Sequence, residues 1–239
     1  MNPLNLLLAA GLGYLCGSFS FARLIARLVA PRKDITVTKL DIKGSDEKFD
    51  MATISATTVS MHLGARYGFI TAVLYMLKLV VPVLATRLLL PGENVFLITA
   101  LAGMIGHVWP VYYGFKGGRG LTAVYGTLFA FDPLGAIVTF FGGIGLGIFV
   151  IRDLFAAYFA GLWLIIPWLW FRTNDPAFLA YGVAVNLVFA VSLIPEIRKY
   201  LELRRKGQTA DVSEAMQMMG LGRGIYRIAK RFGVLKEAK

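Results

Sequence analysis

The hydrophobic residues of this chain come in long continuous runs separated by short polar segments. About twenty helical residues are needed to cross the hydrocarbon core of a bilayer. Seven stretches are candidates for membrane helices: Pro3–Ala30, Tyr67–Leu90, Asn94–Tyr113, Gly120–Phe131, Pro133–Ile151, Leu154–Phe171 and Ala177–Ile194. The pattern therefore predicts an all-α, polytopic membrane helix bundle of about seven transmembrane helices within one domain, residues 1–194.

One of these stretches is too short to cross a bilayer alone. Gly120–Phe131 has twelve residues, which as a helix extend over about 18 Å. A helix that ends within the membrane is tolerated where protein or a polar cavity surrounds its end. This segment therefore requires that the bilayer thins around it, that neighbouring protein encloses its end, or that it lines a polar cavity.

Composition supports a membrane protein over a water-soluble one. Hydrophobic residues make up 57% of the 239 residues and charged residues only 16%, whereas soluble domains carry about 25% charged residues. The single cysteine, Cys16, lies within the first apolar run and excludes an intrachain disulfide framework and a cysteine-based zinc site. No charge precedes Arg23, so we interpret the first run as a membrane helix and not as a signal peptide. We expect no metal and no cofactor.

The distribution of positive charge predicts the orientation in the membrane. The net charge is +11, and the basic residues gather in the connection 31–66, in the loop near Lys116 and Arg119, and in the tail after Ile194, which carries eleven Lys and Arg. Basic loops usually face the cytoplasm. Seven crossings then place the N-terminus outside and the C-terminus inside the cell, with anionic lipid or a phosphorylated substrate, and no nucleic acid, as the partner of these charges.

The polar tail, residues 195–239, contains one amphipathic segment. Gly222–Lys236 alternates apolar residues with Arg223, Arg227, Lys230 and Arg231 at helical spacing. This spacing is typical of a helix that lies in the membrane interface. The segment is interpreted either as a stabilising anchor or as a site for a partner.

The strongest local motif is a glycine-rich basic turn within Gly106–Gly120. Gly117, Gly118 and Gly120 are interleaved with Lys116 and Arg119, just before a predicted helix. Glycines allow close approach of backbone N–H groups, and a helix start is electropositive, so the turn is a candidate phosphate site. The alternative is a basic turn that only sets the topology.

Two further residues are candidates for chemistry. His107 is either a packed helix-end histidine or a general base. Lys78 lies near the middle of an apolar run, where an uncompensated cation costs about 2.5–3.5 kcal/mol. Lys78 must therefore reach a polar cavity, a partner group or the interface.

Polar residues also follow the first apolar run. Ser20, Arg23 and Arg27 share one helix face, close to Ser18. They form either the polar wall of a substrate pocket or a pair of arginines that approach the interface.

Three blocks of the chain resemble those of the bacterial membrane glycerol-3-phosphate acyltransferases that use acyl phosphate as donor. Gly17–Arg27 resembles the family's opening Gly-Ser-Ile-Pro-Phe-Gly block, and Ile54–Gly64 is similar to the end of its Gly-Ser-Gly-Asn-Ile-Gly-Ala-Thr-Asn block. Gly106–Thr122 is similar to the third block, which contains Gly-His and Phe-Lys-Gly-Gly-Lys-Gly, and is the most specific of the three. The likeness covers roughly residues 4–206.

The resemblance implies acyl transfer from acyl phosphate to glycerol 3-phosphate, giving lysophosphatidic acid at the cytoplasmic face of the bacterial inner membrane. It implies catalytic roles for Ser18 and Lys78, to which we add His107 as the candidate general base. It implies substrate-binding roles for Thr57, Thr58, Lys116, Gly117, Gly118 and Arg119. Arg27, on the polar face of the first apolar run, is a further candidate for substrate binding.

The chain departs from the family pattern in its second block and after its last helix. Asp50–Thr53 aligns with the family's Gly-Ser-Gly-Asn, and Leu193 and Glu196 align with a histidine and an asparagine. These departures motivate two alternative hypotheses: a changed acceptor, or a non-catalytic relative that binds acyl phosphate or lipid as a regulator or scaffold. A small transporter is a third hypothesis, motivated by Lys78 and the short helix.

Overall fold

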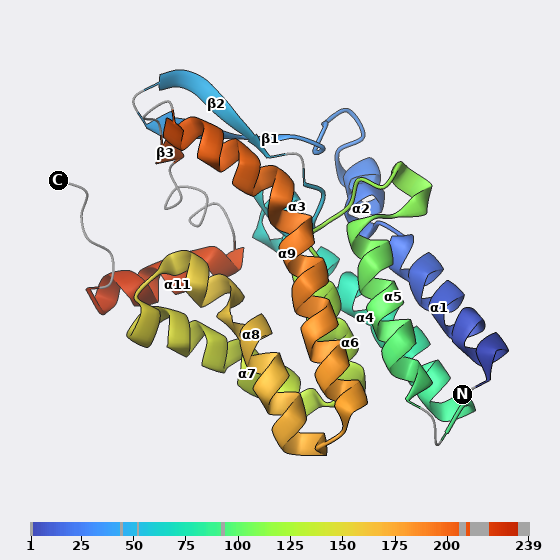
Figure 1. The fold of residues 1–239 in the computed structure, drawn as a ribbon. Coiled ribbons are helices and arrows are strands. Elements are labelled where there is room, and N and C mark those ends of the chain that lie inside the picture. The colour runs from blue at the N-terminus through green and yellow to red at the C-terminus, as the bar shows by residue number, and fades with distance from the viewer. Residues whose placement is uncertain are drawn as a thin grey trace.

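The protein is a bundle of apolar helices with a small β-sheet at one end (Figure 1). The computed structural model describes residues 2–43, 45–51, 53–91, 94–205, 209–210 and 220–233. The helices are α1 (Pro3–Ser18), α2 (Phe21–Val29), α3 (Ala56–Leu63), α4 (Ala65–Leu89), α5 (Val95–Val108), α6 (Leu121–Phe131), α7 (Pro133–Gly145), α8 (Leu154–Thr173), α9 (Pro176–Arg205) and α11 (Gly220–Arg231). A short 3-10 turn, Val111–Tyr113, follows α5, and a π-helical segment, Leu146–Ile151, continues α7.

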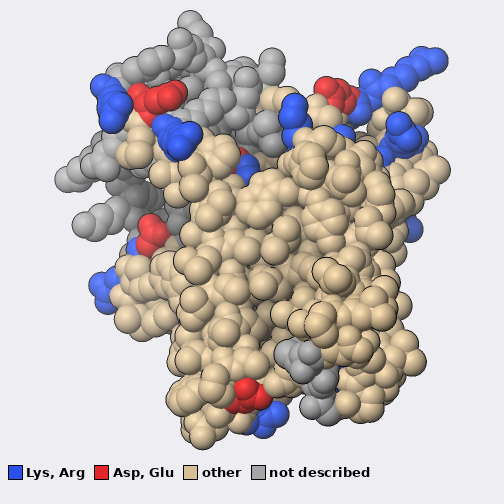
Figure 2. Space-filling model, turned by 45° about the vertical axis from the view of Figure 1, so that its right-hand side comes forward, with Lys and Arg blue, Asp and Glu red and all other residues tan. Residues whose placement is uncertain are grey.

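The surface of the bundle is that of a membrane protein. Five helical segments among the described residues are long and apolar enough to cross a membrane: Pro3–Val29, Ala65–Leu89, Val95–Tyr113, Pro133–Ile151 and Pro176–Arg198. Large apolar side chains point outward from them, with Leu7 71% and Phe141 64% exposed. Figure 2 shows a broad uncharged belt on this face, with most Lys and Arg beyond it toward the sheet. The predicted helical membrane bundle is confirmed, whereas the total of seven crossings and the orientation stay predictions.

The first predicted helix, Pro3–Ala30, is broken in the structure. Phe19 and Ser20 adopt extended conformations between α1 and α2. No proline or glycine stands at these two positions to signal the break. The side chains that bond the residues around this break come from α4.

Glycines allow α1 and α5 to pack closely along most of their length. A Cβ atom at Gly13 would overlap the backbone carbonyl of Thr99, and one at Gly17 would overlap that of Gly103. On the other helix, a Cβ at Gly106 would overlap the carbonyl oxygen of Tyr14. Small residues at such contacts are the usual means by which membrane helices approach one another.

The short helix α6 is enclosed by its neighbours, which is one of the alternatives that its length left open. It begins at Leu121, and its side chains Ala123, Val124 and Leu128 are fully buried. They belong to one core with buried residues of α4, α5, α8 and α9: Leu79, Val83, Met104, Leu162, Ile165, Leu169 and Val185. Inside this core the Thr127 hydroxyl lies 2.6 Å from the Tyr181 hydroxyl, so both polar groups are satisfied.

Sequence reasoning did not predict the sheet. The connection 31–66 contains β1 (Thr38–Lys43) and β2 (Ser45–Met51), paired antiparallel with Thr38 opposite Met51. A two-residue strand, β3 (Thr209–Ala210), pairs antiparallel with the other edge of β1, giving the order β2-β1-β3.

Helix α9 runs further than predicted. It continues through Pro195 to Arg205 toward the sheet, so the predicted boundary at residue 194 falls inside this helix (Figure 1). The predicted tail helix Gly222–Lys236 is present as α11 over Gly220–Arg231. Gly44, Ala52, the turn residues Gly92 and Glu93, and residues 234–236 lie outside the described residues.

The close contact between α1 and α5 generates a stability prediction. Gly13→Ala is expected to lower the melting temperature of the purified protein, because the added methyl group meets the Thr99 backbone, which cannot move aside. A cost of about 1–3 kcal/mol corresponds to a fall of roughly 2–12 °C in a protein of this size. Gly11→Ala is the matched control, since nothing lies within 4 Å of its Cβ position. Equal melting temperatures for the two variants would contradict the packing described.

Candidate active site

A small cleft lies at the break between α1 and α2. Four other parts of the chain line the cleft together with this break: Ile54 before α3, the middle of α4, the end of α5 and the glycine-rich turn. The lining residues are Gly17, Ser18, Phe19, Ser20, Ile54, Tyr75, Lys78, His107, Pro110, Gly117 and Gly118. Among these described lining residues there is no acidic side chain, so the cleft favours an anion.

Lys78 closes the C-terminal end of α1. Its Nζ donates hydrogen bonds to the carbonyl oxygens of Gly17, at 2.6 Å, and Phe19, at 2.7 Å. The last carbonyl groups of a helix lack partners within the helix and carry partial negative charge. The ammonium group therefore finds its compensation in backbone carbonyls, and two of its three N–H donors are occupied.

Tyr75 closes the beginning of α2 from the same face of α4. Its hydroxyl lies 3.0 Å from Ser20 Oγ and accepts a hydrogen bond from the backbone N–H of Ala22 at 3.2 Å. Because Tyr75 and Lys78 are three residues apart, they project side by side, and Lys78 Nζ lies 4.5 Å from the centre of the Tyr75 ring. One turn of α4 thus supports both sides of the break.

His107 links Tyr75 to the glycine-rich turn. The two rings meet edge to face with their centres 4.6 Å apart, and His107 is buried. The backbone N–H of Gly118 donates to the His107 carbonyl at 3.1 Å. A Cβ atom at Gly118 would lie 2.5 Å from His107 Nε2, so only glycine allows the turn to lie against this ring.

Ser18 lies at the last residue of α1 and is 1% exposed. Its hydroxyl donates to the Tyr14 carbonyl at 2.8 Å and accepts from the backbone N–H of Val111 at 3.4 Å. Lys78 lines the same cleft and bonds the carbonyl oxygens of the residues before and after Ser18.

Two cations lie beside the glycine-rich turn that lines the cleft. Lys116 is exposed next to Gly117. The Arg23 guanidinium donates to the Lys116 carbonyl oxygen at 3.0 Å and lies 4.6 Å from the centre of the Tyr113 ring. Arg27 is exposed and does not line the cleft.

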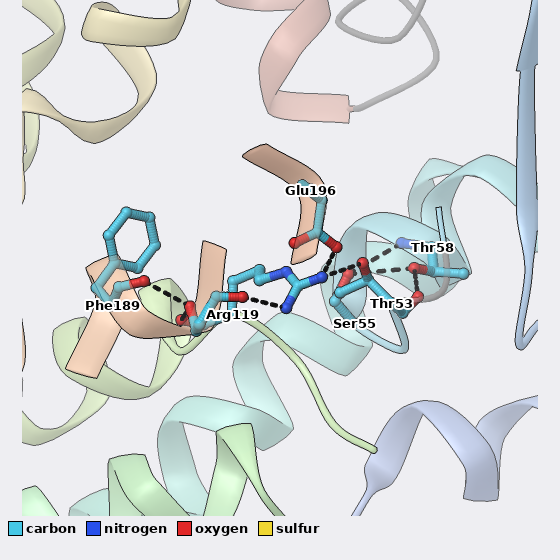
Figure 3. A network of polar contacts seen from close by, with 7 residues as sticks. Thr53, Ser55, Thr58, Arg119, Phe189 and Glu196 are labelled. Carbon is cyan, nitrogen blue, oxygen red and sulfur yellow. Dashed lines mark hydrogen bonds and ion pairs between the residues drawn. The ribbon is translucent and has the colours of Figure 1, made fainter. Parts of the chain in front are cut away.

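The Arg119 side chain bonds to α9 and to the segment before α3 (Figure 3). Its guanidinium forms an ion pair with Glu196 of α9 and donates to the carbonyl of Ser192 and to Thr53 Oγ1. Burial lowers the pKa of Arg119 to about 10, so it stays charged at neutral pH. The charge of Arg119 is thus already neutralised by a carboxylate of the chain.

Thr57 and Thr58 lie in the first turn of α3, beside this network. Thr58 is fully buried, and its hydroxyl donates to the Thr53 carbonyl at 2.5 Å. Its backbone N–H is capped by Ser55 Oγ at 3.2 Å. The Ile54 N–H donates to the Gly117 carbonyl at 3.4 Å, which ties this segment to the glycine-rich turn.

The structure brings together half of the predicted site residues. Ser18, Lys78, His107, Gly117 and Gly118 line one cleft. The other five are not among its lining residues: Arg27, Thr57, Thr58, Lys116 and Arg119. Among the described residues no group of three or more His, Cys, Asp or Glu side chains is placed to hold a metal ion.

Sequence reasoning missed the positions of Tyr75 and Glu196. No predicted role fell on Tyr75, although its place three residues before a lysine within an apolar run was a usable signal. Glu196 was noted as a lost family residue, and no local pattern points from it to Arg119.

The fold defines a polytopic membrane protein with a cleft at a helix break whose described lining residues include no acidic side chain. The family model described as glycerol-3-phosphate acyltransferase matches residues 7–204. This chain therefore belongs to the glycerol-3-phosphate acyltransferase family.

Individual relatives and solved structures agree with this assignment. The glycerol-3-phosphate acyltransferase of Aquifex aeolicus is 34% identical over 57% of this chain and 64% of its own length. That of Desulfotalea psychrophila is 34% identical over 62% of this chain and 67% of its own. This chain thus spans slightly less than two thirds of the Aquifex relative. This chain is also similar to the crystal structure of PlsY (YgiH), an integral membrane glycerol 3-phosphate acyltransferase, in its lysophosphatidic acid form. The two are 26% identical in sequence, the match covers 83% of this chain and 93% of the PlsY chain, and the TM-score is 0.66.

The Arg119–Glu196 ion pair generates the second prediction. Glu196→Gln removes the charge that compensates a half-buried guanidinium, and we expect a loss of about 1–2 kcal/mol, between the values for exposed and buried pairs. The melting temperature should fall by roughly 2–8 °C. Glu202→Gln, an exposed glutamate on the same helix, is the control and should leave it unchanged. A Glu196→Gln variant as stable as the parent would show that the pair contributes nothing to holding α9 against the turn.

Proposed function

We propose that this protein transfers an acyl group from acyl phosphate to glycerol 3-phosphate, forming lysophosphatidic acid and inorganic phosphate. The observation that carries the proposal is the cleft without acidic lining, built from Ser18, Lys78, His107 and the Gly117–Gly118 turn at a break in a membrane helix. Both substrates carry phosphate, which suits such a cleft. The acyl chain of the donor can lie along the apolar outer surface of the neighbouring helices.

In the proposed reaction a hydroxyl oxygen of glycerol 3-phosphate attacks the carbonyl carbon of acyl phosphate. The bond from that carbon to the phosphate oxygen breaks, phosphate leaves, and the hydroxyl proton passes to a base. His107 is the proposed base, since it is the histidine in the cleft wall. Lys78 and the Ser18 hydroxyl would stabilise charge on the carbonyl oxygen and the leaving phosphate.

The remaining predicted residues would bind substrate around this centre. Lys116 is exposed at the mouth and is the proposed contact for the donor phosphate, together with the backbone of Gly117 and Gly118. Arg27, Thr57, Thr58 and Arg119 do not line the cleft, and their proposed contact with substrate requires that the acceptor extends past it. Arg119 would then have to exchange part of its bonding to Glu196 for the acceptor.

The proposed location is the cell (inner) membrane, with the cleft facing the cytoplasm. The glycine-rich turn with Lys116 and Arg119, the basic connection 31–66 and the basic tail would then all be cytoplasmic, in accordance with the positive-inside rule. Membrane lipid would surround the uncharged belt. We further propose residues 1–194 as the acyl-transferring domain and residues 195–239 as a basic, amphipathic cytoplasmic tail.

Lys116→Ala tests the proposed function directly. In liposomes or detergent, the parent protein should form lysophosphatidic acid from palmitoyl phosphate and glycerol 3-phosphate, and Lys116→Ala should reduce this rate by about 100-fold or more because the donor phosphate loses its cation. Arg32→Ala removes an exposed cation outside the cleft and is the control. Absence of acyl transfer by the parent to glycerol 3-phosphate and to other polyol phosphates would refute the proposal. Binding of an acyl-phosphate analogue without turnover would instead favour a non-catalytic relative.

Gly118→Ala tests whether the cleft is the reacting site. The added methyl group would lie 2.5 Å from His107 Nε2 and displace either the ring or the turn. We expect a loss of acyl transfer of about tenfold to 100-fold, since small displacements of catalytic groups have effects of this size. Gly11→Ala, whose Cβ position is open, should retain full activity. Full activity of Gly118→Ala would place the reaction elsewhere.

A further inference from the structure

Helix α11 lies outside the part of the chain that matches the family. The family match ends at residue 204, whereas α11 covers Gly220–Arg231. It nevertheless packs on the bundle, against α8 and α4, through Ile225, which is 2% exposed, and Ala229, which is fully buried. Figure 1 shows it lying across the ends of α7 and α8.

The side chains of α11 fall into three adjoining strips around the helix. At 100° per residue, the buried residues Gly222, Ile225 and Ala229 share one side. The exposed cations occupy the opposite side: Arg223, Arg227, Lys230 and Arg231. Between the two strips lie Ile228 and Phe232, which are apolar and yet 42% and 59% exposed. A helix that only packed on protein would not need this third strip.

The exposed apolar strip continues onto the lipid-facing surface of the bundle. The Phe232 ring packs edge to face on Phe149, with centres 5.0 Å apart. Phe149 belongs to the end of the α7 span and is itself 54% exposed, next to Val150, which is 71% exposed. After Ile151, which is also exposed, comes the exposed Arg152, so the apolar surface ends here and positive charge begins. This boundary is where the head groups of a bilayer would lie.

We propose that α11 is an interfacial helix that binds anionic lipid head groups. Ile228 and Phe232 would insert among the acyl chains beside Phe149, and the four cations would contact the phosphates of the same leaflet. Residues 220–233 contain no aspartate or glutamate, so nothing in the segment compensates this charge. The apolar strip favours lipid over nucleic acid, which would use the cations alone. The helix holds the α7–α8 corner at a fixed depth in the membrane.

The experiment compares amide hydrogen exchange of residues 220–233 in the full chain, in nanodiscs of phosphatidylcholine and in nanodiscs with one third phosphatidylglycerol. We expect exchange to slow by about tenfold in the anionic discs, and this protection to be lost at high salt. The variant R223Q/R227Q/K230Q/R231Q should exchange equally in both discs. The control R32Q/R66Q, which removes two exposed cations elsewhere, should behave like the parent.

Equal exchange of the parent in neutral and anionic discs would overturn the proposal. So would protection that appears only when an acidic soluble protein is added, since α11 would then be a protein-binding surface. If the quadruple variant already exchanges fast in neutral discs, its helix has unfolded, and the salt dependence of the parent decides. None of these outcomes depends on whether the protein transfers acyl groups.

Discussion

The bonds from Lys78 to the carbonyls of Gly17 and Phe19 are the interaction on which the rest of the site depends. A lysine in the middle of a membrane helix needs compensation, and the end of a helix needs donors for its last carbonyl groups. Here the lysine donates to these carbonyl oxygens, so one pair of hydrogen bonds satisfies both requirements. The same turn of α4 supplies Tyr75 to the first N–H groups of α2, so the break is stabilised on both sides. The cleft exists because the first membrane helix stops at this point.

The glycine-rich turn is positioned by a second set of contacts that leaves no room for larger side chains. Gly118 lies against the His107 ring, and His107 lies against Tyr75, so the turn is coupled to the same residue that caps α2. On its other side, Arg119 ties the turn to α9 through Glu196 and Ser192. The glycine-rich turn is thus held by two sets of contacts, one to His107 and one to α9. One of these sets includes the Arg119–Glu196 ion pair between the turn and α9.

The sequence allowed the parts of this arrangement to be predicted but not their contacts. Apolar runs of membrane length set the helical bundle, and the glycines and cations of the turn marked the site. The cost of burying Lys78 required a partner, yet the carbonyls that provide it become available only because the chain breaks at Phe19 and Ser20. Glu196 and Arg119 are distant in the chain, and no periodicity links them. Within β1, residues 39–43 alternate polar and apolar side chains, which was a usable strand signal, whereas β2 begins with four polar residues, 45–48, that give none.

The central claim is that this break, held by Lys78, forms the phosphate-binding cleft of an acyltransferase. The most direct measurement is an experimental structure of the protein with an acyl-phosphonate analogue of the donor. The phosphonate should lie between Ser18, Lys116 and the Gly117–Gly118 backbone, with Lys78 still bonded to Gly17 and Phe19. An analogue bound away from this cleft, or a continuous helix from α1 into α2 with Lys78 detached, would contradict the account.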